Sequence, residues 1–313
     1  MMEVTPDLIR LLALPVFFTV AVLDIRTRRV PSIVWPPLVI FGSLILGWEL
    51  WQYWNIGGFI WDMYVIRVAL SVGVLVPLAV LFWRLHAFGG ADAKALATIA
   101  ILFPTFPTYE IGSIVLPVVD TQLGVFSLTI LTNAVLLGLI YPVGLAVRNA
   151  VYRDVHPAMF VGLPVGWESL DRRHGRLLES SDGFTKQGLD LDALRMYLRW
   201  RGCSLVDIRE NPEMIRTTRP ASTNPPGDGR VTDGGEELTD DDPWGARAFL
   251  DDANGAYGTR PETLRDALFH LSSADEIWIS PGIPFLVPMV LGLVLALTAG
   301  DLLFWAISPL LPI

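Results

Sequence analysis

Apolar segments long enough to cross a lipid bilayer constrain this chain more than any other feature. Hydropathy delimits six such segments, each close to the roughly 20 residues that a helix needs to traverse the hydrocarbon core. They cover approximately residues 8–23, 33–51, 64–83, 93–107, 126–147 and 284–307. The fourth is short and contains Pro104 and Pro107 near its end, so we expect it to be broken or re-entrant unless it extends to Val119. The pattern predicts an all-α polytopic membrane protein with six transmembrane helices.

The distribution of charged residues divides the chain into apolar segments and one acidic, polar segment. Of the 313 residues, 52% are hydrophobic and 18% are charged, whereas soluble domains usually carry about a quarter charged residues. Residues 153–276 contain 23 acidic and 15 basic residues, so this stretch carries −8 of the formal net charge of −9. We expect a membrane domain of five helices over residues 1–150, an acidic insert over residues 151–276, and a C-terminal transmembrane helix within residues 277–313.

The insert is expected to be a partly disordered α+β domain. Leu189 to Arg201 has the periodicity of an amphipathic helix, and Cys203 to Ile208 is expected to be a strand. Pro261 to Leu271 is predicted as a second helix, with Pro261 at an early helical position and Thr259 as its cap. Residues from about 217 to 243 are rich in Thr, Pro, Gly and Asp and contain almost no apolar side chains, which predicts a disordered linker.

The distribution of basic residues predicts the orientation in the membrane. Loops after the first, third and fifth predicted helices are basic and contain Arg26, Arg28, Arg29, Arg84, Lys94, Arg148 and Arg153. The intervening loops contain Asp62, Glu110 and Asp120 and no basic residue. Since cytoplasmic loops carry the excess of Lys and Arg, we expect a multi-pass plasma-membrane protein with both termini outside and the insert in the cytoplasm. An aromatic belt is expected at the outer ends of the second and third helices, formed by Trp48, Trp51, Trp54 and Trp61.

The insert's net charge argues against a nucleic-acid partner. Binding to nucleic acids or to anionic lipids needs basic patches, and the insert is acidic. Lysine occurs only at Lys94 and Lys186, and the other basic residues are arginines. An acidic, arginine-rich surface is typical of halophilic proteins, in which salt screens the self-repulsion; a GC-rich genome is the alternative explanation.

The single cysteine and the few histidines argue against a cofactor. Cys203 stands alone, which excludes an internal disulfide and a Cys-x-x-Cys site, and we expect it to be a packing residue. None of the four histidines, His86, His156, His174 and His270, is paired at the spacing of metal ligands. We therefore expect neither a metal nor another cofactor.

Two aspartates stand where predicted helices meet the membrane surface. Asp24 ends the first helix and is followed by a basic run; Asp92 follows Gly89 and Gly90 just before the fourth. Each has a simpler interpretation. Asp24 could pair with an arginine of a stop-transfer cluster, and Asp92 could cap a helix N-terminus, where its charge favours the dipole.

Considered together, the two aspartates predict a catalytic pair. The first helix leaves and the fourth enters the membrane on the same side, so both carboxylates should lie at one depth and be able to meet. Two carboxylates in one confined site cannot both ionise cheaply, so one keeps its proton. The ionised carboxylate can take a proton from water while the protonated one donates to a scissile carbonyl. This chemistry indicates an aspartic peptidase.

Three segments resemble the type IV prepilin peptidases, in particular the archaeal members. Asp24, the basic run and Val30-Pro31-Ser32 resemble the first aspartate motif, and the segment from Gly89 to Lys94 resembles the second, which is Gly-x-Gly-Asp followed by x-Lys. The segment from Ile277 to Phe285 is similar to the archaeal entry into the last helix. The resemblance leaves out the insert. It departs from the motif at Ala91, where the family has glycine, so the loop is expected to turn at Gly89 or Gly90.

The resemblance implies a function and its residues. Asp24 and Asp92 would be catalytic, with Gly89, Gly90 and Lys94 supporting them. Such an enzyme would remove short basic leader peptides from prepilin-like and preflagellin (prearchaellin) proteins at the cytoplasmic face, without N-methylation. Two alternatives remain: a protease that cuts ordinary helices, as signal peptide peptidases do, and a transporter or scaffold. Against the first, Leu23 rather than tyrosine precedes Asp24; against the second, neither repeat symmetry nor midplane charges are present.

Overall fold

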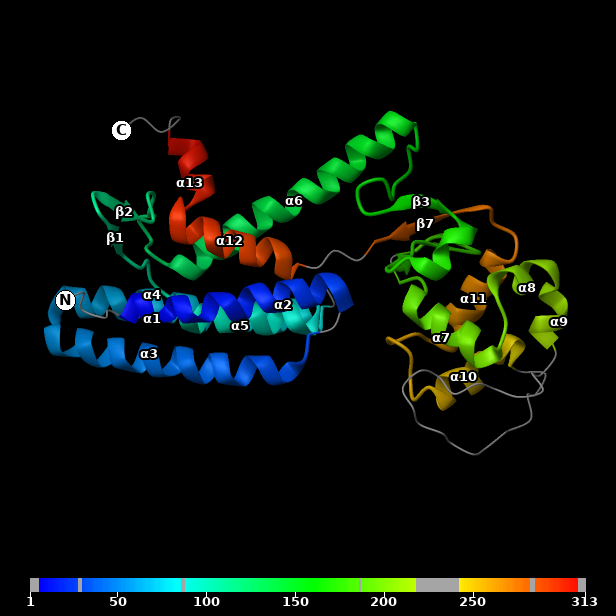
Figure 1. The fold of residues 1–313 in the computed structure, drawn as a ribbon, viewed down its shortest axis with the longest axis horizontal. Helices are drawn as coiled ribbons and strands as arrows, with labels where there is room; N and C mark the ends of the chain where they lie inside the picture. Colours follow the sequence, from blue (N-terminus) through cyan, green and yellow to red (C-terminus); the bar gives the residue numbers. More distant parts are fainter. Residues whose placement is uncertain are drawn as a thin grey trace. The chain divides into compact units, whose positions relative to one another are not determined.

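A computed structural model describes residues 6–27, 30–85, 88–185, 187–217, 242–281 and 285–308 of the chain, apart from the side chains of Ile111 and Thr217. The chain divides into two compact units, Met1–Tyr141 with Pro284–Ile313, and Pro142–Ile283. We refer to them as the membrane unit and the insert unit. The structure is mostly helical, with short strands in both units (Figure 1).

Four helices confirm the first, second, third and fifth predicted membrane spans. Within the described residues these are the helices long and apolar enough to cross a membrane: Pro6–Thr27, Ser32–Ile56, Gly58–Arg84 and Phe126–Tyr152. The first is built from α1 (Pro6–Arg10), η1 (Leu11–Ala13) and α2 (Leu14–Thr27); the second from η2 (Ser32–Val34) and α3 (Trp35–Ile56); the third and fourth are α4 (Gly58–Arg84) and α6 (Phe126–Tyr152). The protein is therefore a multi-pass membrane protein.

Six full spans are not confirmed, because the fourth predicted span is a short helix. Helix α5 (Gly90–Leu102) has 13 residues and covers about 20 Å at 1.5 Å per residue, against a hydrocarbon core of about 30 Å. It ends before Pro104 and Pro107, and the chain continues into a hairpin of β1 (Tyr109–Ile111) and β2 (Ile114–Leu116). The expectation of a broken segment is thus the one that the structure supports.

The sixth predicted span is interrupted as well. Helix α12 (Leu286–Thr298) also has 13 residues, and α13 (Leu302–Ile307) follows after a break. At the break Gly300 has φ +90°, and a Cβ atom there would lie 1.8 Å from the carbonyl oxygen of Val119. Asp301 then starts α13 by accepting a hydrogen bond from the N–H of Phe304 at 2.8 Å. Hydropathy reads the apolar residues on both sides of this turn as one span.

The short helices pack closely among the long ones. Helix α5 contacts α3 and α4, and α2 contacts α12; Figure 1 shows α2, α3, α4 and α5 running side by side. A Cβ atom on Gly42 of α3 would lie 2.9 Å from Cγ of Leu102, and one on Gly292 of α12 would lie 2.7 Å from the backbone nitrogen of Ala134. Small residues at such crossings let helix backbones approach without a side chain between them.

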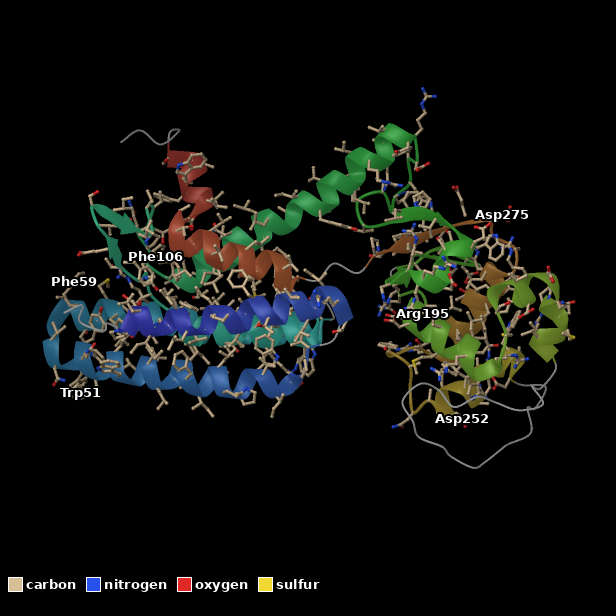
Figure 2. The ribbon with its side chains drawn as sticks, viewed as in Figure 1. Trp51, Phe59, Phe106, Arg195, Asp252 and Asp275 are labelled. Atoms are coloured by element: carbon tan, nitrogen blue, oxygen red, sulfur yellow. The ribbon has the colours of Figure 1, made fainter. Side chains whose placement is uncertain are left out.

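Large aromatic side chains gather where α3 ends and α4 begins, as the sequence predicts. Figure 2 shows Trp51 and Phe59 at that end of the two helices, pointing away from the bundle, and both are exposed. The rings of Trp54 and Trp61 meet edge to face, with centroids 5.2 Å apart. Exposed indoles at a helix end are typical of the membrane–water boundary.

The insert unit is a small α+β domain built on an antiparallel sheet. The sheet has the order β3 (Leu163–Gly166), β7 (Glu276–Ser280) and β4 (Arg176–Leu177), and a second pair is formed by β5 (Glu179–Ser180) and β6 (Gly183–Phe184). Helices α7 (Leu191–Arg201), α8 (Leu205–Glu210), α9 (Pro212–Thr217), α10 (Ala246–Asp252) and α11 (Pro261–Leu271) enclose a buried core with this sheet. The segment that resembles the entry to the last helix therefore begins as the central strand of this sheet.

Two local predictions for the insert are wrong and two are confirmed. Helices α7 and α11 match the predicted amphipathic segments. The predicted strand Cys203–Ile208 is helical, because Ser204 and Asp207 form a reciprocal cap that starts α8. Thr259 is not the cap of α11; the N-cap is Arg260 in an extended conformation, with Pro261 as the first helical residue. The predicted linker falls largely on residues 218–241, outside the described residues.

Candidate active site

Asp24 lies on the core-facing side of α2. Its side chain shares this face with Phe17, Val20 and Ala21, which are all buried, at the three- and four-residue spacing of one helix face. Asp24 is 9% exposed, whereas Arg26 on the neighbouring face is exposed. The last turn of this helix therefore directs the Asp24 carboxylate into the protein interior.

Asp92 occupies the first turn of α5 and caps it. Its Oδ2 accepts a hydrogen bond from the N–H of Gly89, the N-cap residue, at 3.1 Å. Its carboxylate also accepts from the backbone N–H of Leu286, the first residue of α12. The simpler interpretation, that Asp92 caps a helix N-terminus, is thus confirmed. The same contacts hold the Asp92 carboxylate between the first residues of α5 and α12.

Gly89 is needed for a close approach rather than for a left-handed turn. Its φ is −64°, a conformation open to any residue, but a Cβ atom there would lie 3.0 Å from Oδ2 of Asp92. Gly90 and Ala91 lie in the helix, where an L-residue is at ease. The chain turns into the helix at Gly89, as expected, but neither Gly89 nor Gly90 has a positive φ, and the alanine at position 91 causes no strain.

The structure brings Asp24 and Asp92 within electrostatic reach of each other. Asp92 lies outside the four helices of spanning length, ahead of the apolar part of α5. Burial, and then the charge of Asp24, raise the pKa of Asp92 to about 6, although the N–H groups of Gly89 and Leu286 oppose the shift. Mutual repulsion of this kind is what makes two carboxylates share one proton.

Lys94 contacts a residue of the first motif. Its Nζ donates a hydrogen bond to Oγ of Ser32 at 2.8 Å and so joins α5 to η2. The sequence indicates Ser32 only as the last residue of the first aspartate motif. This hydrogen bond therefore ties the start of α5 to the segment that follows Asp24.

Aromatic rings hold the start of α12 beside Asp92. Phe88, just before Gly89, stacks on Phe285 with centroids 5.0 Å apart and meets Phe82 of α4 edge to face at 5.0 Å. This cluster sets the position of Leu286, whose N–H reaches Asp92. The sequence analysis includes Phe285 only as the end of the segment that resembles the archaeal entry, and it does not single out Leu286.

Four other acidic residues of the membrane unit have different surroundings. Asp62, Glu110 and Asp120 are exposed. Asp301 is buried and structural: it accepts a hydrogen bond from Oγ1 of Thr129 at 2.9 Å and caps α13. Among the described residues, no group of three or more His, Cys, Asp or Glu side chains could hold a metal ion.

Fold and site together define a class of protein: multi-pass helical membrane proteins with two coupled carboxylates at helix ends. Two family models match the chain. The type IV leader peptidase family matches residues 11–143, and the archaeal peptidase A24 C-terminus, type II, matches residues 240–302. The chain therefore belongs to the type IV leader peptidase family, a protease family, and its C-terminal part is of the archaeal type.

These matches also show how far the family extends along the chain. The first contains Asp24 and Asp92. The second covers α10, α11, β7 and α12, so the later part of the insert belongs to the family, contrary to the sequence-based expectation that the insert lies outside it. No curated protein and no solved structure matches the chain.

Proposed function

We propose that this protein is an aspartic endopeptidase in which Asp24 and Asp92 cut short basic leader peptides from prepilin-like and preflagellin proteins at the cytoplasmic membrane face. The observation that carries the proposal is the interaction of the two carboxylates, Asp24 buried and Asp92 half-buried by helix packing, and both within the family match. Membership of the leader peptidase family supports prepilin-like proteins as the substrates.

In the proposed mechanism Asp92 is the acid and Asp24 the base. Ionised Asp24 takes a proton from water as the water oxygen attacks the scissile carbonyl carbon, and Asp92 gives its proton to the carbonyl oxygen. The roles then reverse: the gem-diol returns a proton to Asp92, Asp24 protonates the leaving nitrogen, and the C–N bond breaks. The raised pKa of Asp92 supports this assignment, since it keeps the proton at a pH where an ordinary aspartate has lost it.

The proposed membrane face follows from charge. Arg26, Arg84 and Arg148 stand near the ends of three spanning helices on the side predicted to be cytoplasmic. A substrate with a basic leader before an apolar helix would keep its leader on that side, next to Asp24 and Asp92.

Co-expression with a candidate substrate tests the proposal. Loss of a few leader residues, located by mass spectrometry of the product's N-terminus, supports a leader peptidase. A cut inside the apolar helix would instead support a protease of the signal peptide peptidase kind. Absence of any cut with several prepilin-like substrates would favour the transporter or scaffold.

A further inference from the structure

Exposed apolar side chains cluster in the insert unit where α6 ends. Val151 and Tyr152 in the last turn of α6, and Val155, Phe160 and Val161 in the loop that follows, are all exposed, Val155 by 77%. Figure 1 shows this loop between the end of α6 and β3. Phe184 of β6 joins them through His156, whose ring lies 5.9 Å from that of Phe184. We call these six apolar residues the 151–161 surface.

This loop is folded, so the exposure is not that of a loose chain. The buried side chain of Asn149 donates hydrogen bonds to the carbonyl oxygens of Met159 at 2.9 Å and Gly162 at 2.8 Å. Arg153 adopts a left-handed conformation, with φ 65°, that turns the chain at the end of α6. Ala158 is fully buried beneath the turn. The backbone is thus fixed in a form that directs apolar side chains outward.

Water is a poor environment for this surface, and a membrane interface is a good one. A group of exposed apolar side chains on an ordered backbone marks an interaction site for a protein or a membrane. Helix α6 has 27 residues, about 40 Å at 1.5 Å per residue, which is about 10 Å longer than the hydrocarbon core is thick. The surface is continuous with the C-terminal end of α6. The guanidinium of Arg148 lies 5.1 Å from the centroid of the Tyr152 ring, which suits an interfacial turn.

We propose that the 151–161 surface is a membrane-docking surface that inserts into the boundary between lipid headgroups and acyl chains. The apolar side chains provide the attachment, since the insert carries a net negative charge overall. Docking of this kind would anchor the insert unit at the bilayer independently of peptidase activity.

Fluorescence quenching of the full-length protein in zwitterionic nanodiscs tests this proposal with matched positions. An environment-sensitive label is attached at Val161→Cys and, as control, at Val206→Cys on α8, in a Cys203→Ala background. The two valines are 47% and 44% exposed in the insert unit. Phe160→Cys and Met214→Cys, both 56% exposed, form a second pair should one variant fold poorly.

Each outcome decides the matter. We expect the ratio of quenching by lipids brominated near the headgroup to quenching by aqueous iodide to be roughly threefold higher at Val161 than at Val206. The ratio should persist in high salt, because the contact is apolar. Equal ratios at the two positions would overturn the proposal. Protection from iodide without quenching by brominated lipid would also overturn it, in favour of a protein partner or a second copy.

Discussion

At the scale of single residues, the two carboxylates are expected to be indispensable and unlike other aspartates in the membrane unit. Asp24→Asn and Asp92→Asn keep the shape but remove the acid–base function, so each should lower the cleavage rate at least about 10²-fold. The check is product formation with a co-expressed substrate, normalised to the amount of enzyme in the membrane.

Asp62→Asn and Asp120→Asn are the matched controls, because both residues are exposed. Asp301→Asn is a poor control, since Asp301 is buried and caps α13. A dyad variant that cleaves at the rate of these controls would exclude the proposed mechanism.

The raised pKa of Asp92 predicts how activity depends on pH. Because Asp92 must hold a proton to act as acid, and its pKa is raised to about 6 by burial and Asp24, the rate of the purified enzyme should fall as pH rises beyond 6. Well above the pKa the loss should approach about tenfold per pH unit. The apparent pKa belongs to the pair rather than to one residue. A rate that increases steadily from pH 6 to pH 9 would contradict a mechanism in which the two carboxylates share one proton.

The same shift has a consequence for stability. Asp92 binds its proton more tightly in the folded protein than at its ordinary pKa of 3.8. Its contribution therefore favours the folded state at low pH and is lost as pH rises from about 4 through about 6. Asp92→Asn should flatten this part of a thermal-stability profile.

Two adjacent glycines are expected to respond differently to alanine. A Cβ atom on Gly89 would stand 3.0 Å from Oδ2 of Asp92, and one on Gly90 would stand 3.7 Å from Nε1 of Trp83. Gly89→Ala should thus displace the carboxylate and lower kcat about tenfold or more, while Gly90→Ala, in the first turn of a helix, should retain activity. Single-turnover assays on both variants check this. The opposite order would mean that Gly90, not Gly89, sets the position of Asp92.

At the scale of secondary-structure elements, local pattern predicted the long helices and failed at the short ones. Hydropathy measures the affinity of a segment for lipid and is insensitive to a break inside it. Thus α5, followed by Pro104 and Pro107, could be suspected, while the turn at Gly300 was read as part of one helix. In the insert, Ser204 and Asp207 have the spacing of a capping box, which indicates the start of α8. The short apolar alternation in the same residues instead favoured a strand.

The break between α12 and α13 gives a prediction of its own. At Gly300 the backbone has φ +90°, and a Cβ atom would collide with the carbonyl oxygen of Val119. Gly300→Ala should destabilise the protein by more than about 1 kcal/mol. Gly73→Ala in α4, where nothing lies within 4 Å of the added atom, is the control and should be neutral or stabilising. Thermal unfolding in detergent compares the two; equal melting temperatures would show that the break tolerates a side chain.

At the scale of the whole molecule, the sequence could not reveal which distant segments pair. The sheet of the insert unit places β7 between β3 and β4, although about a hundred residues separate β7 from its partners in the chain. Such pairing depends on long-range contacts that no local period records. The candidate site could be proposed from the sequence for a different reason. Alternating membrane crossings place the end of α2 and the start of α5 on one side, so two charged residues could be brought together by topology alone.

The orientation of that topology is the last prediction, and it can be tested without measuring catalysis. Positive-inside reasoning places the connection between α3 and α4 outside and the insert unit in the cytoplasm. In a Cys203→Ala background, Asp62→Cys should react with a membrane-impermeant maleimide in intact cells, and Met214→Cys should react only after permeabilisation; both positions are exposed. Labelling of Asp62→Cys only after permeabilisation would place Asp24 and Asp92, which lie across the α4 span from Asp62, on the wrong side for a cytoplasmic leader. The proposed membrane face would then fail even if both aspartates proved essential for cleavage.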